Sequence, residues 1–338
     1  MPTRIGKLDV DYTNRFQKSV ADLSDYNLLN AAEKLEFERK AGLYGNFTGS
    51  SDIDVKRQKD YYEKLDRVKA GINTNWLKIP LRTGLTQTHN VNVMGGTPLF
   101  RYTLMAGIND VRGVMDKSDR RDASVRVNLT YGDFSKLFLQ YTARIESGQS
   151  HDVPYGSFAD YAQLNPYDAP YNNHGELNTE LAFGMANPIY EKTLSSYIEQ
   201  KSRVISNSAK LRWNVVKHLR LEGTIALTQT QNDNETFFSP RSVKFNYTDK
   251  AKRGSFDILH SNATDFSANA FAVWSKAFKA HQVIATLGLN LQATENESNG
   301  FTAIGILSDK IDHASQAAAF AEGSTPKGGK DKARMFGG

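Results

Sequence analysis

Residues 99–109 read Leu-Phe-Arg-Tyr-Thr-Leu-Met-Ala-Gly-Ile-Asn, and their side chains alternate in character. One set is apolar and the other is mostly polar: Phe100, Tyr102, Leu104, Ala106 and Ile108 against Arg101, Thr103, Gly107 and Asn109, with Met105 as the exception. A period of two places each set on one side of a β-strand. Strands of about ten residues with this alternation are typical of transmembrane β-barrels.

The same alternation recurs along much of the chain. In residues 136–145 it sets an apolar row against a polar one: Leu137, Leu139, Tyr141, Ala143 and Ile145 against Lys136, Gln140, Thr142 and Arg144. The pattern predicts nine strands, near residues 3–17, 84–94, 99–110, 122–132, 135–146, 202–215, 218–229, 264–276 and 281–293.

The connections between these strands alternate in length. Short turns fall near residues 95–98, 132–133, 216–218 and 277–280, whereas 111–121, 147–201, 230–263 and everything after 294 are long. Such alternation predicts an all-β fold: an antiparallel up-and-down transmembrane β-barrel segment, about nine strands of a larger barrel. In outer-membrane barrels the short turns are periplasmic and the long loops are extracellular.

The first long connection, residues 19–82, carries signals for two short helices. Asn30 and Glu33 are spaced as a capping box, and Gly42 can end that helix. The same spacing begins at Ser51, ahead of a second helix. We therefore expect a helical loop rather than an extended one.

We expect the second helix to end at Gly71. One face of this helix carries aromatic and aliphatic side chains: Tyr61, Tyr62, Leu65 and Val68. Such a face either binds a partner or packs within a folded loop. We favour packing.

Composition sets limits on the class of protein. The chain has 338 residues, 39% of them hydrophobic, and its mean hydropathy is −0.52. A barrel strand needs only every second residue to be apolar, so this value is compatible with a membrane protein. No apolar run approaches the roughly 18 residues of a spanning helix. There is no cysteine, and the modest net charge of +5 does not indicate a nucleic-acid surface.

The loop of residues 148–200 is rich in aromatic side chains and proline. Aromatic rings among polar neighbours can stack on sugars or hold a peptide. The alternative is that the rings pack on one another and order the loop. Our candidates for ligand or partner contact are Trp76, Tyr155, Phe158, Tyr161, Tyr167 and Tyr171.

Four arginines lie within the predicted strands: Arg101, Arg126, Arg144 and Arg220. Charged residues in a membrane strand are tolerated where they face a wet lumen. We expect these four to face the lumen, as members of a charge network more often than as a path for solute.

Motifs for covalent chemistry are missing from the sequence. The seven histidines show no metal-ligand spacing, and there is no G-x-S-x-G, P-loop or G-x-G-x-x-G motif. Residues 232–235 are Asn-Asp-Asn-Glu, but their spacing is not that of a known calcium loop. We predict no catalytic residue, no cofactor and no metal, and expect that the protein is not an enzyme.

Four stretches resemble the SusC/RagA-like family of TonB-dependent outer-membrane transporters of Bacteroidetes. They are DYNLLNAAEKLEFERKAGLY (25–44), GINTNWLKIPLRTGLTQTHNVNVMGGTPLFRYTLMAGINDVRGVMDKSDRRD (71–122), PYGSFADYAQLNPY (154–167) and AAFAEGSTPKGGKDKARMFGG (318–338). The resemblance extends over essentially the whole chain.

The resemblance implies a barrel of about 22 strands in the cell outer membrane, occluded by an N-terminal plug. It also implies import of oligosaccharide or peptide cargo, a SusD-like surface lipoprotein as partner, contact with outer-membrane lipid, and energy from the TonB complex. The chain opens with Met1-Pro2-Thr3-Arg4 and no apolar h-region. We therefore expect only the first part of the barrel region here, with the signal peptide, plug and TonB-contacting motif outside it.

Two other classes of protein remain open from the sequence. A soluble β-sandwich that binds glycans through the aromatic loop would have shorter strands and more equal turns. A glycosidase would need two carboxylates facing one another across a cleft, and no such pair stands out in the sequence.

Overall fold

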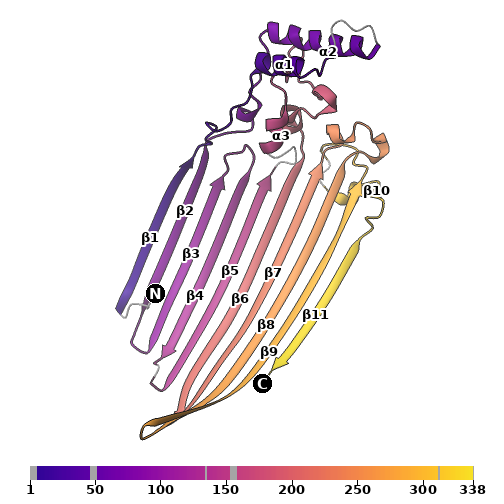
Figure 1. The fold of residues 1–338 in the computed structure, drawn as a ribbon. Helices are drawn as coiled ribbons and strands as arrows, with labels where there is room; N and C mark the ends of the chain where they lie inside the picture. Colours follow the sequence, from indigo (N-terminus) through magenta and orange to yellow (C-terminus); the bar gives the residue numbers. More distant parts are fainter. Residues whose placement is uncertain (1–5, 46–51, 134, 153–157, 311–312, 338) are drawn as a thin grey trace.

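The strands of this protein form a single antiparallel sheet. The structure, a computed structural model, describes residues 6–45, 52–133, 135–152, 158–310 and 313–337. The 11-stranded sheet follows chain order from β1 to β10, and β11 pairs with β9 (Figure 1). The strands are β1 (Gly6–Ser19), β2 (Gly84–Gly96), β3 (Phe100–Arg112), β4 (Asp119–Gly132), β5 (Leu137–Asp152), β6 (Tyr197–Val216), β7 (Leu219–Phe238), β8 (Ser255–Phe278), β9 (His281–Ile304), β10 (Ala319–Phe320) and β11 (Lys327–Gly337).

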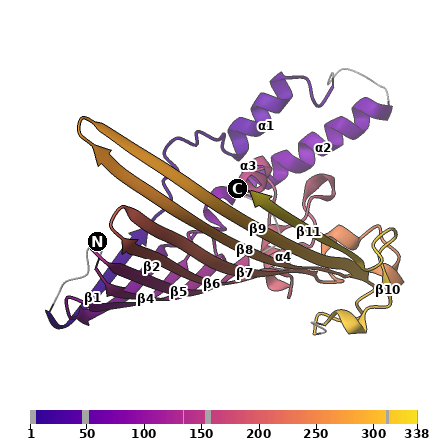
Figure 2. The same cartoon turned by 90° about the horizontal axis from the view of Figure 1, so that it is seen from below.

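The long connections and the short turns lie at opposite ends of the sheet, as the sequence predicts. The first long connection holds α1 (Ala31–Lys40) and α2 (Asp52–Lys69), and the connection from β5 to β6 holds α3 (Phe158–Gln163) and α4 (Pro188–Thr193). These helices gather at one end of the strands in Figure 1. Figure 2 shows the twist of the sheet and the same gathering of loops at one end.

The register keeps most side chains of one kind on one face, with Asn207 on the apolar side and Phe138, Phe271 and Val273 on the polar side as exceptions. Leu104 pairs with Val127, which pairs with Ala143, whereas Thr103 pairs with Asn128, which pairs with Thr142. Each pairing joins residues that point the same way, so the alternation of single strands becomes two continuous surfaces. We call them the apolar face (the side of Leu104 and Val127) and the polar face (the side of Thr103 and Asn128).

The predicted helices are confirmed. The Asn30 side chain accepts a hydrogen bond from the Glu33 backbone N–H, and the Glu33 carboxylate accepts one from the Asn30 N–H. Gly42 follows α1 with a φ of 78°, a left-handed conformation that glycine adopts at little cost. Ser51, the expected cap of the second helix, lies outside the described residues.

Most strands are longer than predicted. β7 extends to Phe238, and β8 and β9 have 24 residues each. Beyond about residue 228 of β7 both faces are polar, so the alternation disappears although the strand continues. Because the two faces do not differ there, the sequence pattern predicted strands that are too short.

The prediction of a loop after residue 294 is wrong. β9 continues to Ile304, and β10 and β11 both return along it. The eleven strands therefore exceed the nine expected. β11 contains three lysines, an arginine and three glycines and shows no alternation, so nothing in its composition marks it as a strand.

The sheet has two edges. In the part of the chain that the structure describes, β1 pairs only with β2, and no pairing joins β1 to β10 or β11. Each unpaired backbone group costs several kcal/mol in lipid, against a typical net stability of about 5–15 kcal/mol. A membrane-embedded form of this sheet therefore requires further strands along its edges.

Gly132 sits at a turn that only glycine can form without strain. Its φ is 85°, and a Cβ built on it would lie 1.9 Å from the Leu137 carbonyl oxygen. We predict that Gly132→Ala lowers the free energy of unfolding by about 1–3 kcal/mol. Gly329→Ala is the control, because no atom lies within 4 Å of its added Cβ. Urea unfolding in lipid vesicles measures both, and equal stabilities would contradict the prediction.

Candidate functional site

The apolar face is exposed although it is the most hydrophobic surface of the protein. Leu104 is 40% exposed, Ile145 53% and Leu287 71%. The three buried hydrophobic clusters found among the described residues include no residue from the middle of this face. Apolar patches much larger than a few hundred Å² mark contact with a membrane or another protein. Since the described strands form one sheet with no second sheet packed on it, the β-sandwich alternative loses its structural basis.

The apolar face approaches the height of a bilayer core. In β3 it extends from Phe100 to Ile108, about 26 Å along the strand at about 3.3 Å per residue. A strand tilt of about 35–45° reduces this to about 19–22 Å, close to the roughly 25 Å of known barrels. Aromatic residues collect on the face near the short turns, as in an interfacial girdle: Phe100, Tyr102, Tyr131, Trp213, Trp274 and Phe278.

Toward the long loops the same side of the sheet becomes polar. His260 Nδ1 lies 2.7 Å from the Asp233 carboxylate, and Glu199 forms ion pairs with Lys201 (2.7 Å) and His151 (2.9 Å). Such pairs belong in water rather than in lipid. The apolar band therefore ends near Ile108, Ile145 and Leu227, and the strands extend beyond it.

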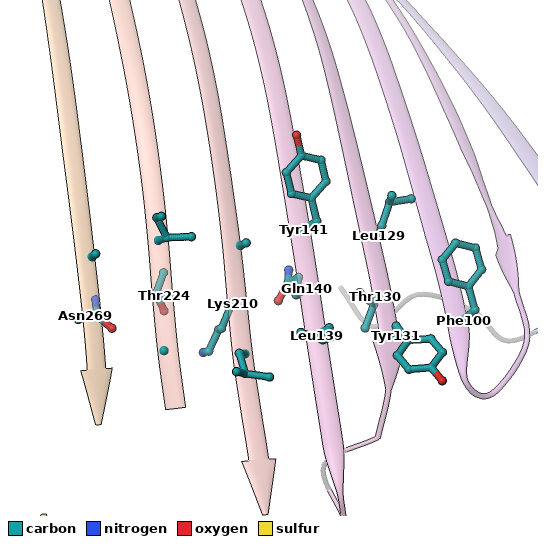
Figure 3. A pocket seen from close by; sticks show the side chains of 15 residues that line it. Phe100, Leu129, Thr130, Tyr131, Leu139, Gln140, Tyr141, Lys210, Thr224 and Asn269 are labelled. Atoms are coloured by element: carbon teal, nitrogen blue, oxygen red, sulfur yellow. The ribbon is translucent and has the colours of Figure 1, made fainter. Parts of the chain in front are cut away.

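A hollow of about 510 Å³ lies in the apolar band. Its lining includes the small residues Ala209, Gly223 and Ala268. The rings of Tyr131 and Tyr141 stand beside it (Figure 3). Its lining offers little polar surface, so its shape and chemistry suit a lipid acyl chain better than a polar ligand.

The polar face is bound together by hydrogen bonds between strands. The Thr142 hydroxyl donates to Asn128 Oδ1 at 2.9 Å, and the Ser206 and Thr228 hydroxyls lie 3.1 Å apart. Thr294 similarly donates to Asp265 at 2.9 Å. Such a surface pairs many of its polar groups across strands and can face water.

The register places all four predicted arginines on the polar face. Arg144 forms an ion pair with Glu146, and Arg220 Nε lies 2.9 Å from the Glu222 carboxylate. Arg101 Nε is buried without a hydrogen-bond partner in the structure. Arg126 forms no ion pair with any described residue. The charge network thus includes two of the four arginines, and their lumenal position stays a prediction.

The long loops pack into a cap around the half-buried carboxylate of Glu38. Tyr167 donates a hydrogen bond to Glu38 of α1 at 2.9 Å, and Tyr44 donates to the same carboxylate. Lys64 of α2 is only 4% exposed, with its ammonium 5.0 Å and 5.3 Å from the ring centres of Tyr44 and Tyr167. Burial, helped by the Glu38 charge, raises the pKa of Tyr167, so its hydroxyl stays protonated.

The predicted contact residues are mostly core residues of this cap. Trp76 is 3% exposed and donates its indole N–H to the Asn165 carbonyl at 2.8 Å. Tyr161 belongs to the same cluster as Trp76, and Phe158 packs against it. Tyr167 belongs to a second cluster. Their role in ligand contact stays a prediction, and it would require the cap to open.

The remaining two candidates differ. Tyr171 is 49% exposed and could contact a ligand without rearrangement. Tyr155 lies outside the described residues. On α2, Tyr61, Leu65 and Val68 pack against the second cluster, as the packing hypothesis requires, whereas Tyr62 is exposed.

Sequence reasoning missed Glu38, Lys64 and Asp168. Lys64 lies four residues after Asp60 and pairs with it at 2.7 Å, a spacing that in a sequence suggests a solvent-exposed pair. Asp168 is 2% exposed, its burial raises its pKa, and its nearest cation is Arg67 at 3.6 Å. The tertiary packing of the two loops buries Lys64 and Asp168 and half-buries Glu38.

No helix among the described residues is long and apolar enough to cross a membrane. Within those same residues, no group of three or more His, Asp and Glu side chains could hold a metal ion.

The single sheet, its two unlike faces and its alternating connections define an antiparallel up-and-down β-barrel segment. Comparison with solved structures finds the same fold in the RagAB peptide transporter, with a TM-score of 0.77, 16% identity, and coverage of 99% of this chain and 40% of that chain. At the same coverage, the RagAB peptide importer gives TM-scores of 0.76 in its closed-closed state (16% identity) and 0.74 in its open-open state (18% identity). No family model and no curated protein matches the chain.

At such low sequence identity, the structural similarity establishes the fold of this chain and not its activity, substrate or partners. The chain spans 40% of the length of the chains it superposes on.

The apolar face can be tested with adjacent residues of β7. Ile225 lies on the apolar face, inside the band, and Ala226 lies on the polar face. We predict that Ile225→Arg destabilises the folded protein in lipid by about 2–4 kcal/mol and that Ala226→Arg costs much less. Unfolding in vesicles measures both variants, and an equal or reversed order would mean that the faces are assigned wrongly.

The cap can be tested at the Glu38 carboxylate. Tyr167→Phe removes one hydroxyl donor from Glu38, and hydrogen bonds to charged groups contribute about 1.5–3 kcal/mol. We predict faster proteolytic cleavage in the loops of this variant. Tyr171→Phe is the control because Tyr171 is exposed and no bond of its hydroxyl is seen among the described residues. Cleavage of the Tyr167 variant at the wild-type rate would contradict this account of the cap.

Proposed function

We propose that this chain is part of a SusC-like, TonB-dependent transporter of the outer membrane that imports oligopeptides or oligosaccharides. The observation that carries the proposal is the sheet with one exposed apolar face of bilayer height and one hydrogen-bonded polar face. Closure of such a sheet by further strands would turn the apolar face to lipid and the polar face to a water-filled lumen.

The proposed mechanism involves binding and movement, and no covalent chemistry. Cargo binds at the cap and at a SusD-like surface lipoprotein, an internal plug moves, and the cargo passes along the polar face. The TonB complex would act through parts of the protein outside this chain. The end-to-end resemblance in sequence supports the lipoprotein partner and the energy source, and the folded cap would supply the extracellular surface.

Of the two cargo classes, we favour oligopeptides. The solved structures that share this fold are those of a peptide importer.

The test is the growth and uptake of the native host after deletion of the gene. We expect the deletion strain to lose uptake of labelled oligopeptides, and the intact gene to restore it. If the deletion strain lost only oligosaccharide uptake, the proposal of a transporter would stand, but its cargo would be oligosaccharides rather than oligopeptides. Unchanged uptake of both, with the protein found outside the membrane fraction, would refute the proposal.

A further inference from the structure

Two arginines face each other across β4 and β5. Arg126 pairs in register with Arg144, so both side chains stand on the polar face. Directly opposed residues of an antiparallel pair have Cβ atoms about 4.5–5.5 Å apart, and like charges in such positions repel. The next residues along this row are neutral: Met105 beside Arg126 and Ser206 beside Arg144.

The acidic groups nearby leave one of the two charges uncompensated. Arg144 forms an ion pair with Glu146. The Arg126 guanidinium forms no hydrogen bond or ion pair within the part of the chain that the structure describes. Asp122, farther along β4, is already paired with Arg120 at 3.0 Å. A group that brings one negative charge would therefore relieve the repulsion.

The surroundings are suited to a carboxylate in particular. A guanidinium presents its N–H donors in a planar fork that matches the two oxygens of a carboxylate. Asn128 Oδ1 is occupied by Thr142, which leaves the Asn128 amide N–H groups to donate. Both arginines are only partly buried, so a ligand on the polar face can reach them.

The pair lies within the membrane-facing height of the sheet. Val125 and Val127, the chain neighbours of Arg126, belong to the apolar face. In a closed barrel the arginines would therefore stand partway along the lumen wall, where low-dielectric surroundings focus their field. Cargo that crosses the membrane would have to pass them.

We propose that Arg126 and Arg144 form a carboxylate-binding site on the transport path. The inference rests on the proposed import function and adds a substrate feature to it: the site selects cargo that carries a carboxylate. Two sources supply that group, the C-terminus of an oligopeptide and a uronic acid residue of an oligosaccharide.

The experiment uses the full-length protein with its lipoprotein partner and matched ligands. One oligopeptide is prepared with a free C-terminus and with a C-terminal amide, and one oligosaccharide with and without a uronic acid. Binding to the purified complex is measured by calorimetry, and uptake is measured in cells. We expect the free-acid form of one pair to bind about tenfold more tightly than its neutral form, as one charge-assisted hydrogen bond allows.

The variants separate this site from general electrostatics. Arg126→Gln should abolish the preference, and Arg126→Lys should keep part of it because the charge remains. Arg203→Gln is the control, since Arg203 lies on the opposite side of the sheet and is exposed. It should leave the preference unchanged.

Two results would overturn the site and leave the import function intact: equal binding of acid and neutral forms by the wild type, or an equal loss for both forms in Arg126→Gln. An equal loss for both forms in Arg126→Gln would mean that Arg126 contacts another part of the protein rather than the ligand carboxylate. If the complex prefers the carboxylate form in binding but cells take up neither form, the binding site stands and the import function is refuted.

Discussion

The structure depends on one constraint: the hydrogen bonds between strands must be satisfied without mixing the two kinds of side chain. Every pairing from β2 to β9 joins residues of the same face over the band from Leu104 to Leu289. A shift of β4 by one residue against its neighbours would move Arg126 into the apolar face and Val127 into the polar one. The need to keep apolar side chains together selects this register, and this register in turn produces the continuous apolar face.

That constraint also determines where the rest of the protein can lie. The long strands carry the chain past the apolar band into a zone where both sides of the sheet are polar, with ion pairs such as Asp233 with His260. The cap is built beyond this zone, around Glu38 and Lys64. Packing of the loops thus orders a surface well away from the band.

The sequence predicted those parts of the fold where the two faces differ. β3 and β5 were predictable because apolar and polar residues alternate in them, as Leu104 does with Thr103 and Leu139 with Gln140. The outer halves of β7–β9 and all of β11 were not, because nothing alternates there and pairing alone makes them strands. Of the candidate site, the sequence identified the arginines and the rings, but burial of Trp76 and Tyr167 depends on contacts between loops far apart in the chain. No local pattern encodes such contacts.

The most direct test of the account is an accessibility scan of β4. Nitroxide labels are placed one at a time from Ala123 to Tyr131 in the full-length protein in bilayers, and their collisions with oxygen and with a water-soluble nickel complex are measured. The account predicts oxygen maxima at Ala123, Val125, Val127, Leu129 and Tyr131 and nickel maxima at the residues between them. Uniform protection of both sets, as in a closed hydrophobic interior, would contradict it.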